Sequence, residues 1–174
     1  MRSHAEKISF CAILIAFGMI LSYVEAIVPI NLVIPFPGFK LGLANISVML
    51  AFFVLGIRYA VAVSVCRISL CALLFGSATS FFFSLCGGIL SLIAMLAYSL
   101  ILKRFNGVLG LSVLCAAMHD LGQCIACSIL FGHYVITFYL PYLLMFSIIT
   151  GSITGLLVHK FTKLNFLAKG TFCK

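Results

Sequence analysis

Six apolar runs, separated by short stretches rich in glycine, proline and polar residues, divide this chain from one end to the other. They cover residues 8–30, 44–55, 58–75, 80–102, 108–131 and 138–159. Five have about the 20 residues that a helix needs to cross the hydrocarbon core of a bilayer. The second has about a dozen, so we expect it to be tilted or supported by the preceding segment. The pattern predicts an all-α integral membrane protein, a six-helix bundle forming one transmembrane domain over residues 1–174.

The composition supports this pattern and excludes a soluble domain. Of the 174 residues, 64% are hydrophobic and 8% are charged. A single water-soluble core could not bury so much apolar surface. The first run follows Arg2 and Lys7, as in a signal peptide, but it is longer than a signal's apolar region and lacks a small-x-small cleavage site. We therefore expect it to be retained as the first membrane helix.

Basic residues indicate the orientation of the chain. With six crossings, most of them fall on one side: Arg2, Lys7, Arg58, Lys103, Arg104, Lys160, Lys163, Lys169 and Lys174. Lys40 alone falls in a loop on the other side. Because basic loops remain in the cytoplasm, both termini are predicted to be cytoplasmic and the Lys40 loop external. The net charge of +8 is then explained by orientation and anionic lipid, so no nucleic-acid partner is expected.

A few polar residues interrupt the predicted membrane helices. Glu25 lies late in the first, Arg67 midway along the third, and His119 and Asp120 midway along the fifth. A charge facing lipid costs about 3 kcal/mol or more, so each should face the interior. Arg67 and Asp120 have similar depth and are expected to form an ion pair. That pair could bind a solute, or it could only hold the helices together.

Helical spacing extends these positions into stripes that could line one cavity. One stripe contains Ala116, His119, Asp120, Gln123 and Cys127, and the other contains Ala60, Ser64, Arg67 and Cys71. Small residues mark expected close helix contacts, namely Ala12 and Ala16, the group Gly87, Gly88 and Ser91, and the pair Gly151 and Gly155. Ala12 and Ala16 lie on a different face of the first helix from Glu25.

Catalytic and metal chemistry have little support. Cys124 and Cys127 have CxxC spacing, but they lie inside an apolar helix without a second pair. The chain has three acidic residues in all, so it contains no aspartate-rich motif that could hold magnesium and a diphosphate. It also lacks a phosphate-binding glycine loop and a GxSxG motif. We predict no catalytic residue, no metal site and no cofactor.

Several stretches resemble a known family. They are "PGFKLGLANI" (37–46), "RISLCALLFGS" (67–77), "FSLCGGILSLIAM" (83–95), "AAMHDLGQ" (116–123) and "YLPYLLMFSIITGSITGLL" (139–157). Together they are similar to the bacterial Gx transporter family, which is also labelled heptaprenyl diphosphate synthase component I. One departure is visible, because His119-Asp120 stands where the family pattern has His-Asn.

The resemblance implies a substrate-binding subunit like those of energy-coupling factor transporters, in the bacterial cytoplasmic membrane. Such a subunit binds a vitamin-like or anionic solute outside and docks on an energy-coupling transmembrane protein with ATPases. The candidate solute contacts are Glu25, Lys40, Asn45, Arg67, His119, Asp120 and Gln123. An AxxxA face on the first helix docks the partner in that family, and Ala12 and Ala16 match it. The older label implies instead a non-catalytic membrane partner of a soluble prenyl diphosphate synthase subunit. A third hypothesis is a structural scaffold.

Overall fold

A computed structural model describes residues 3–27, 42–101, 107–132 and 134–171. This part of the chain contains helices and no strands. The helices are α1 (His4–Ile27), α2 (Asn45–Leu55), α3 (Ile57–Phe75), α4 (Ala78–Ile101), α5 (Val108–Phe131) and α6 (Tyr134–Thr171). Five of them are long and apolar enough to cross a membrane, and α2 is a shorter apolar helix. The predicted all-α, multi-pass membrane fold is therefore confirmed.

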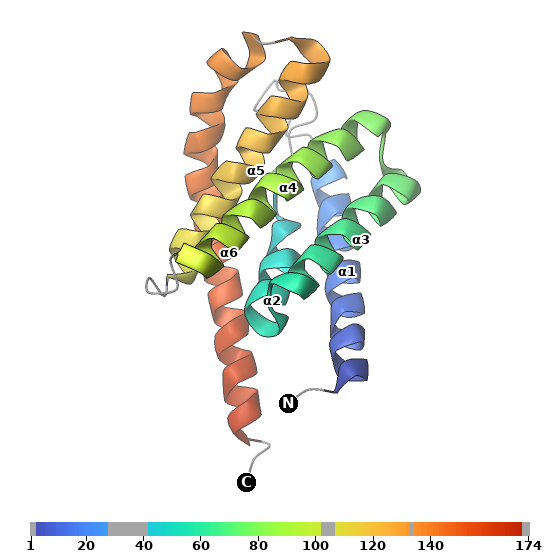
Figure 1. The fold of residues 1–174 in the computed structure, drawn as a ribbon, viewed down its shortest axis with the longest axis vertical. Coiled ribbons are helices and arrows are strands. Elements are labelled where there is room, and N and C mark those ends of the chain that lie inside the picture. The colour runs from blue at the N-terminus through green and yellow to red at the C-terminus, as the bar shows by residue number, and fades with distance from the viewer. Residues whose placement is uncertain (1–2, 28–41, 102–106, 133, 172–174) are drawn as a thin grey trace.

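Successive helices run in alternating directions, so the start of α1 and the end of α6 lie at the same end of the molecule (Figure 1). The helix α2 has 11 residues and spans about 16 Å at 1.5 Å per residue, roughly half of the hydrocarbon core. Its residues from Asn45 to Ala51 are all buried. A helix that is apolar all round is stable where other helices cover it. The helix α2 packs against α1, α3 and α6.

Local sequence explains where several helices begin and turn. Ser3 and Glu6 form a capping box at the start of α1, in which each side chain bonds the other's backbone N–H at 3.2 Å. At the start of α4, the backbone N–H of Ser80 donates to the Ser77 hydroxyl at 3.1 Å. Gly56 joins α2 to α3 with a φ of 99°, a conformation that glycine adopts without strain.

Glycines set the close packing of α4, α5 and α6, which the sequence predicted for Gly151 but not for Gly122. A methyl group at Gly122 of α5 would lie 2.6 Å from the carbonyl oxygen of Cys86 on α4. On the other side of α5, a methyl group at Gly151 of α6 would lie 2.6 Å from the Cα of Val113. Ser112 and Thr154 bond across the same α5 and α6 interface at 2.6 Å. The backbones approach this closely because no side chain separates them.

The helix boundaries differ from the predicted spans mainly at the chain ends. The first helix begins at His4, where the capping box places it, and α6 begins at Tyr134 and continues to Thr171 instead of covering 138–159. Hydropathy identifies only the part of a helix that lies inside the membrane. The residues after His159 are more polar, so the hydropathy falls there although the helix continues to Thr171. Pro141 lies inside α6.

Candidate functional site

Buried polar side chains from α1, α2, α3 and α5 gather inside the bundle. They are Ser22, Glu25, Asn45, Ser47, Arg67, His119, Asp120 and Gln123. The two predicted stripes on α3 and α5 do face the interior, with Ala60, Ser64 and Arg67 buried on one and His119, Asp120, Gln123 and Cys127 buried on the other. We call this set of eight side chains the polar cluster.

Arg67 points from α3 toward α1. Its Nη1 donates a hydrogen bond of 3.1 Å to the hydroxyl of Ser22, and its Cδ lies where a side chain at Gly18 would be, 2.6 Å from the position of a methyl group there. Its Nε has no hydrogen-bond partner among the described residues. Gly18 thus makes room for a buried guanidinium between α1 and α3.

The predicted ion pair between Arg67 and Asp120 is wrong, because no salt bridge joins these two residues in the described part of the chain. Equal depth in the membrane brings two residues to one level, but the direction of each side chain decides whether they meet. The carboxylate of Glu25 is instead near enough to both Arg67 and Asp120 to act on them electrostatically. Glu25 is therefore a neighbour of both charges that were expected to pair.

Glu25 also connects α1 to the segment that begins α2. Its Oε1 accepts a hydrogen bond of 2.5 Å from the backbone N–H of Leu43. This contact fixes the two ends of the segment between α1 and α2 close to each other. Lys40 and most of the stretch "PGFKLGLANI" lie outside the described residues.

His119 and Asn45 meet at Gly42. A methyl group at Gly42 would lie 3.5 Å from both Asn45 Nδ2 and His119 Cδ2, and the residue has a φ of 75°. On its other side the His119 imidazole packs on Gly87 of α4, where a methyl group would lie 2.7 Å from Nδ1. Gly42 and Gly87 were not predicted as site residues, although both are conspicuous breakers in "KLGLAN" and "LCGGIL".

A small cavity adjoins His119 and Asn45 between α2, α5 and α6. It is lined by Gly42, Asn45, Met49, Ser112, Cys115, Ala116, His119, Thr150 and Thr154. Its volume is about 10 Å³, which is room for about one water molecule. A vitamin-sized solute needs a pocket of roughly 300 Å³ or more, so these helices would have to separate to admit it.

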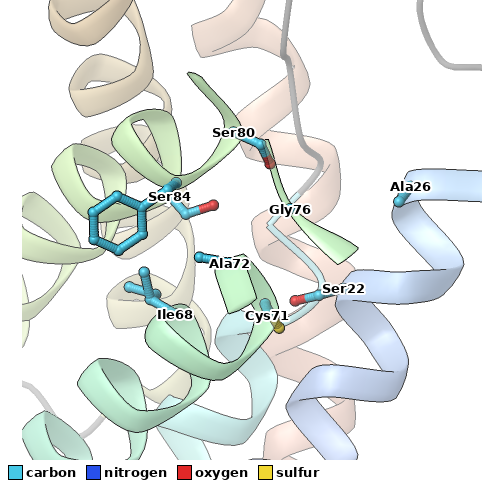
Figure 2. A pocket seen from close by; sticks show the side chains of 9 residues that line it. Ser22, Ala26, Ile68, Cys71, Ala72, Gly76, Ser80 and Ser84 are labelled. Carbon is cyan, nitrogen blue, oxygen red and sulfur yellow. The ribbon is translucent and has the colours of Figure 1, made fainter. Parts of the chain in front are cut away.

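A second pocket lies between α1, α3 and the start of α4 (Figure 2). It is lined by Ser22, Ala26, Ile68, Cys71, Ala72, Gly76, Ser80, Phe81 and Ser84, and its volume is about 40 Å³. We call it the serine pocket. It shares Ser22 with the polar cluster, but its other lining residues are separate from that cluster.

The predicted docking residues Ala12 and Ala16 are both exposed on α1. The opposite side of that helix buries Leu14, Gly18 and Ser22. The small face is therefore available at the surface of the bundle. Among the described residues no three His, Cys, Asp or Glu side chains lie close enough to hold a metal ion.

Comparison with protein families shows to which family the chain is related. Residues 14–161 match the family described as heptaprenyl diphosphate synthase component I. The chain belongs to this family. The match reaches from α1 into α6 and confirms the resemblance found in the sequence. No curated protein and no solved structure gives a significant match. The family description names one component of a synthase.

Proposed function

We propose that this chain is the membrane-embedded, substrate-binding subunit of a transporter. It captures a small solute from the outer face and works with an energy-coupling transmembrane protein and ATPases. The observation that carries the proposal is the polar cluster, in which Glu25, Arg67 and Asp120 are buried at the centre of a bundle. Charged side chains inside membrane helices are costly and generally serve a ligand or ion path.

The bonding of Arg67 favours a ligand site over a scaffold. A scaffold gains most from fully paired charges, since each unsatisfied buried group costs free energy. Arg67 instead bonds a neutral serine and keeps its Nε without a partner in the described part of the chain. The Nε–H of Arg67 could therefore donate a hydrogen bond to a polar solute, and the side chain of Asp120 could accept one.

The proposal extends to the other predicted contacts and to the orientation. Asn45, His119 and Gln123 are buried in the polar cluster, so they are candidate solute contacts along with Lys40. The basic residues predict that Lys40 is on the outer face. Both termini would then lie in the cytoplasm of a bacterial cell, as the distribution of basic residues predicts.

The family description favours one alternative, a membrane component of a heptaprenyl diphosphate synthase in isoprenoid or menaquinone side-chain synthesis. With three acidic residues, this chain has no set of carboxylates for a magnesium diphosphate. Catalysis would therefore belong to a soluble partner subunit. Exposed Lys160 and Lys163 near the end of α6 would be candidate contacts for that subunit.

Native mass spectrometry tests the transporter proposal. The chain, purified in mild detergent from cells grown on rich medium, should retain a small molecule. Arg67→Ala and Asp120→Ala should each lose it, because each removes a charged group from the polar cluster. Arg58→Ala removes an exposed arginine near the start of α3 and should retain it. Equal retention by all three variants would rule out the polar cluster as the solute site.

A further inference from the structure

Two hydroxyl groups of the serine pocket, those of Ser22 and Ser80, carry protons that no described residue accepts. The Ser22 oxygen accepts its bond from Arg67, so its own O–H is left to donate, and no described residue accepts it. The Ser80 side chain likewise has no hydrogen bond to a described residue; only its backbone N–H is bonded, to Ser77. Ser22 is 6% exposed, so its donor is almost completely buried. Such a donor favours a ligand that accepts hydrogen bonds.

The side chains converge on one space. Figure 2 shows the hydroxyls of Ser22, from α1, and Ser84, from α4, directed toward the gap above Ala72 and Cys71 of α3. Ser80 contributes from the first turn of α4. Donors from two helices thus surround a volume of about 40 Å³, enough for about three waters or a group of similar size.

The electrostatics of the pocket favour a negative ligand. No carboxylate lines it, and the Arg67 guanidinium lies directly behind Ser22. The first turn of the 24-residue helix α4 forms part of the wall, and the N-terminal end of a helix carries partial positive charge. The opposing charge is Glu25, one turn along α1, whose Oε1 bonds the backbone of Leu43. A ligand oxyanion would accept from Ser22 and Ser80 with Arg67 as the charge behind them.

The rim of the pocket is apolar. Ala26 and Phe81 line it and are exposed, and the neighbouring α3 residues Leu73 and Leu74 are exposed by 82% and 66%. In a membrane helix, exposed leucines of this kind contact acyl chains. A molecule whose head is an oxyanion and whose tail is a hydrocarbon chain would match both the interior and the rim.

We propose that the serine pocket binds an oxyanion of the phosphate type, as the headgroup of a membrane amphiphile. This site lies between α1, α3 and α4, away from the cavity between α2, α5 and α6, and it shares Ser22 and Arg67 with the polar cluster. Ser80 donates from α4, and Ser22, held by Arg67, donates from α1. Free inorganic phosphate offers the same chemistry, so the test includes both sources.

Binding to the purified chain in a non-ionic detergent tests the proposal. The probes are dihexanoyl phosphatidic acid, dihexanoyl phosphatidylcholine and inorganic phosphate, followed by native mass spectrometry and calorimetric titration. We expect phosphatidic acid to bind and phosphatidylcholine to bind much more weakly, because its choline group blocks close contact of the phosphate with the serines. Ser80→Ala should weaken binding about tenfold, as loss of one hydrogen bond to a charged group implies.

Two further variants separate the pocket from general effects on the fold. Ala72→Leu fills the pocket without changing a polar group and should abolish binding. Ser152→Ala removes a hydroxyl that bonds its own helix at Ile148, so binding should be unchanged. Binding of inorganic phosphate alone would support the oxyanion site and identify its ligand as a free anion. Absence of binding by both phosphate probes, or equal binding by Ser80→Ala, Ala72→Leu and the unmodified chain, would overturn the proposal.

Discussion

A charged side chain inside a bilayer is stable only where the surrounding protein accepts its hydrogen bonds and excludes lipid, and Arg67 is such a residue. Gly18 leaves space for its side chain, and Ser22 accepts its bond at 3.1 Å. Both contacts come from α1, which therefore determines where the guanidinium lies. These contacts of Arg67 therefore hold α3 against α1.

This arrangement predicts the effect of Ser22→Ala. The substitution removes the acceptor of a buried guanidinium N–H, and a buried donor left without an acceptor costs about 1–3 kcal/mol. We expect the free energy of unfolding in detergent to fall by about that amount, measured by denaturant titration. The matched control Ser152→Ala removes a hydroxyl on α6 bonded within its own helix and should change stability by no more than about 0.5 kcal/mol. Equal stability of the two variants would contradict the role of Ser22.

At the residue scale the sequence predicts burial better than it predicts partners. The cost of a charge in lipid is enough to predict that Glu25, Arg67 and Asp120 are interior, and they are buried. The partner of Arg67 depends on side-chain direction and on the space at Gly18, which helical periodicity alone does not give. For that reason Asp120 was predicted as the partner, whereas Arg67 bonds Ser22.

Helices of this bundle pack through positions that lack side chains. Gly122 of α5 faces the backbone of α4 at Cys86 and Gly87, while Gly110 of the same helix has open space around it. The two glycines have the same helical conformation but different surroundings. Alanine substitutions at the two positions therefore separate the effect of helix packing on stability from the effect of helix propensity.

We predict opposite effects for alanine at these two positions. Gly122→Ala forces α4 and α5 apart and should destabilise the fold by about 1–3 kcal/mol. Gly110→Ala meets no neighbouring atom within 4 Å and should be neutral or stabilising by up to about 1 kcal/mol, because alanine favours the helix. Thermal unfolding in detergent measures both. A destabilisation of the same size in both variants would show that the contact with α4 is not responsible.

The face of α1 that carries Ala12 and Ala16 gives a prediction about partner binding. Ala12→Leu adds a larger side chain at an exposed position, so the chain should fold normally but lose co-purification with an energy-coupling membrane partner. The control Val61→Leu changes a residue of α3 that is 41% exposed and should leave co-purification intact. Normal partner recovery with Ala12→Leu would exclude this face as the docking surface.

At the element scale, hydrophobic runs were sufficient to predict the helices and the short second span. Small residues were sufficient to predict close contacts at Gly87, Gly88, Gly151 and Gly155. The extension of α6 to Thr171 was missed because a hydropathy pattern ends where the membrane ends, whereas backbone hydrogen bonds continue as long as no breaker interrupts the helix.

At the scale of the whole molecule, the short helix α2 packs between α1, α3 and α6 (Figure 1). The Glu25 contact with Leu43 and the Gly42 contact with His119 connect the start of this helix to α1 and α5. Movement of α2 would therefore change the polar cluster and its small cavity together. The transporter proposal requires such a movement, because the cavity of about 10 Å³ is too small for a vitamin-sized solute.

The most direct test of the proposed function is recovery of the chain from native membranes with whatever it binds. An affinity-tagged chain, expressed at its natural level and extracted in mild detergent, is analysed by quantitative mass spectrometry. The transporter proposal predicts recovery of an energy-coupling transmembrane protein together with its ATPases. Recovery of a soluble prenyl diphosphate synthase subunit, without any such membrane partner or ATPase, would contradict it and establish the synthase alternative.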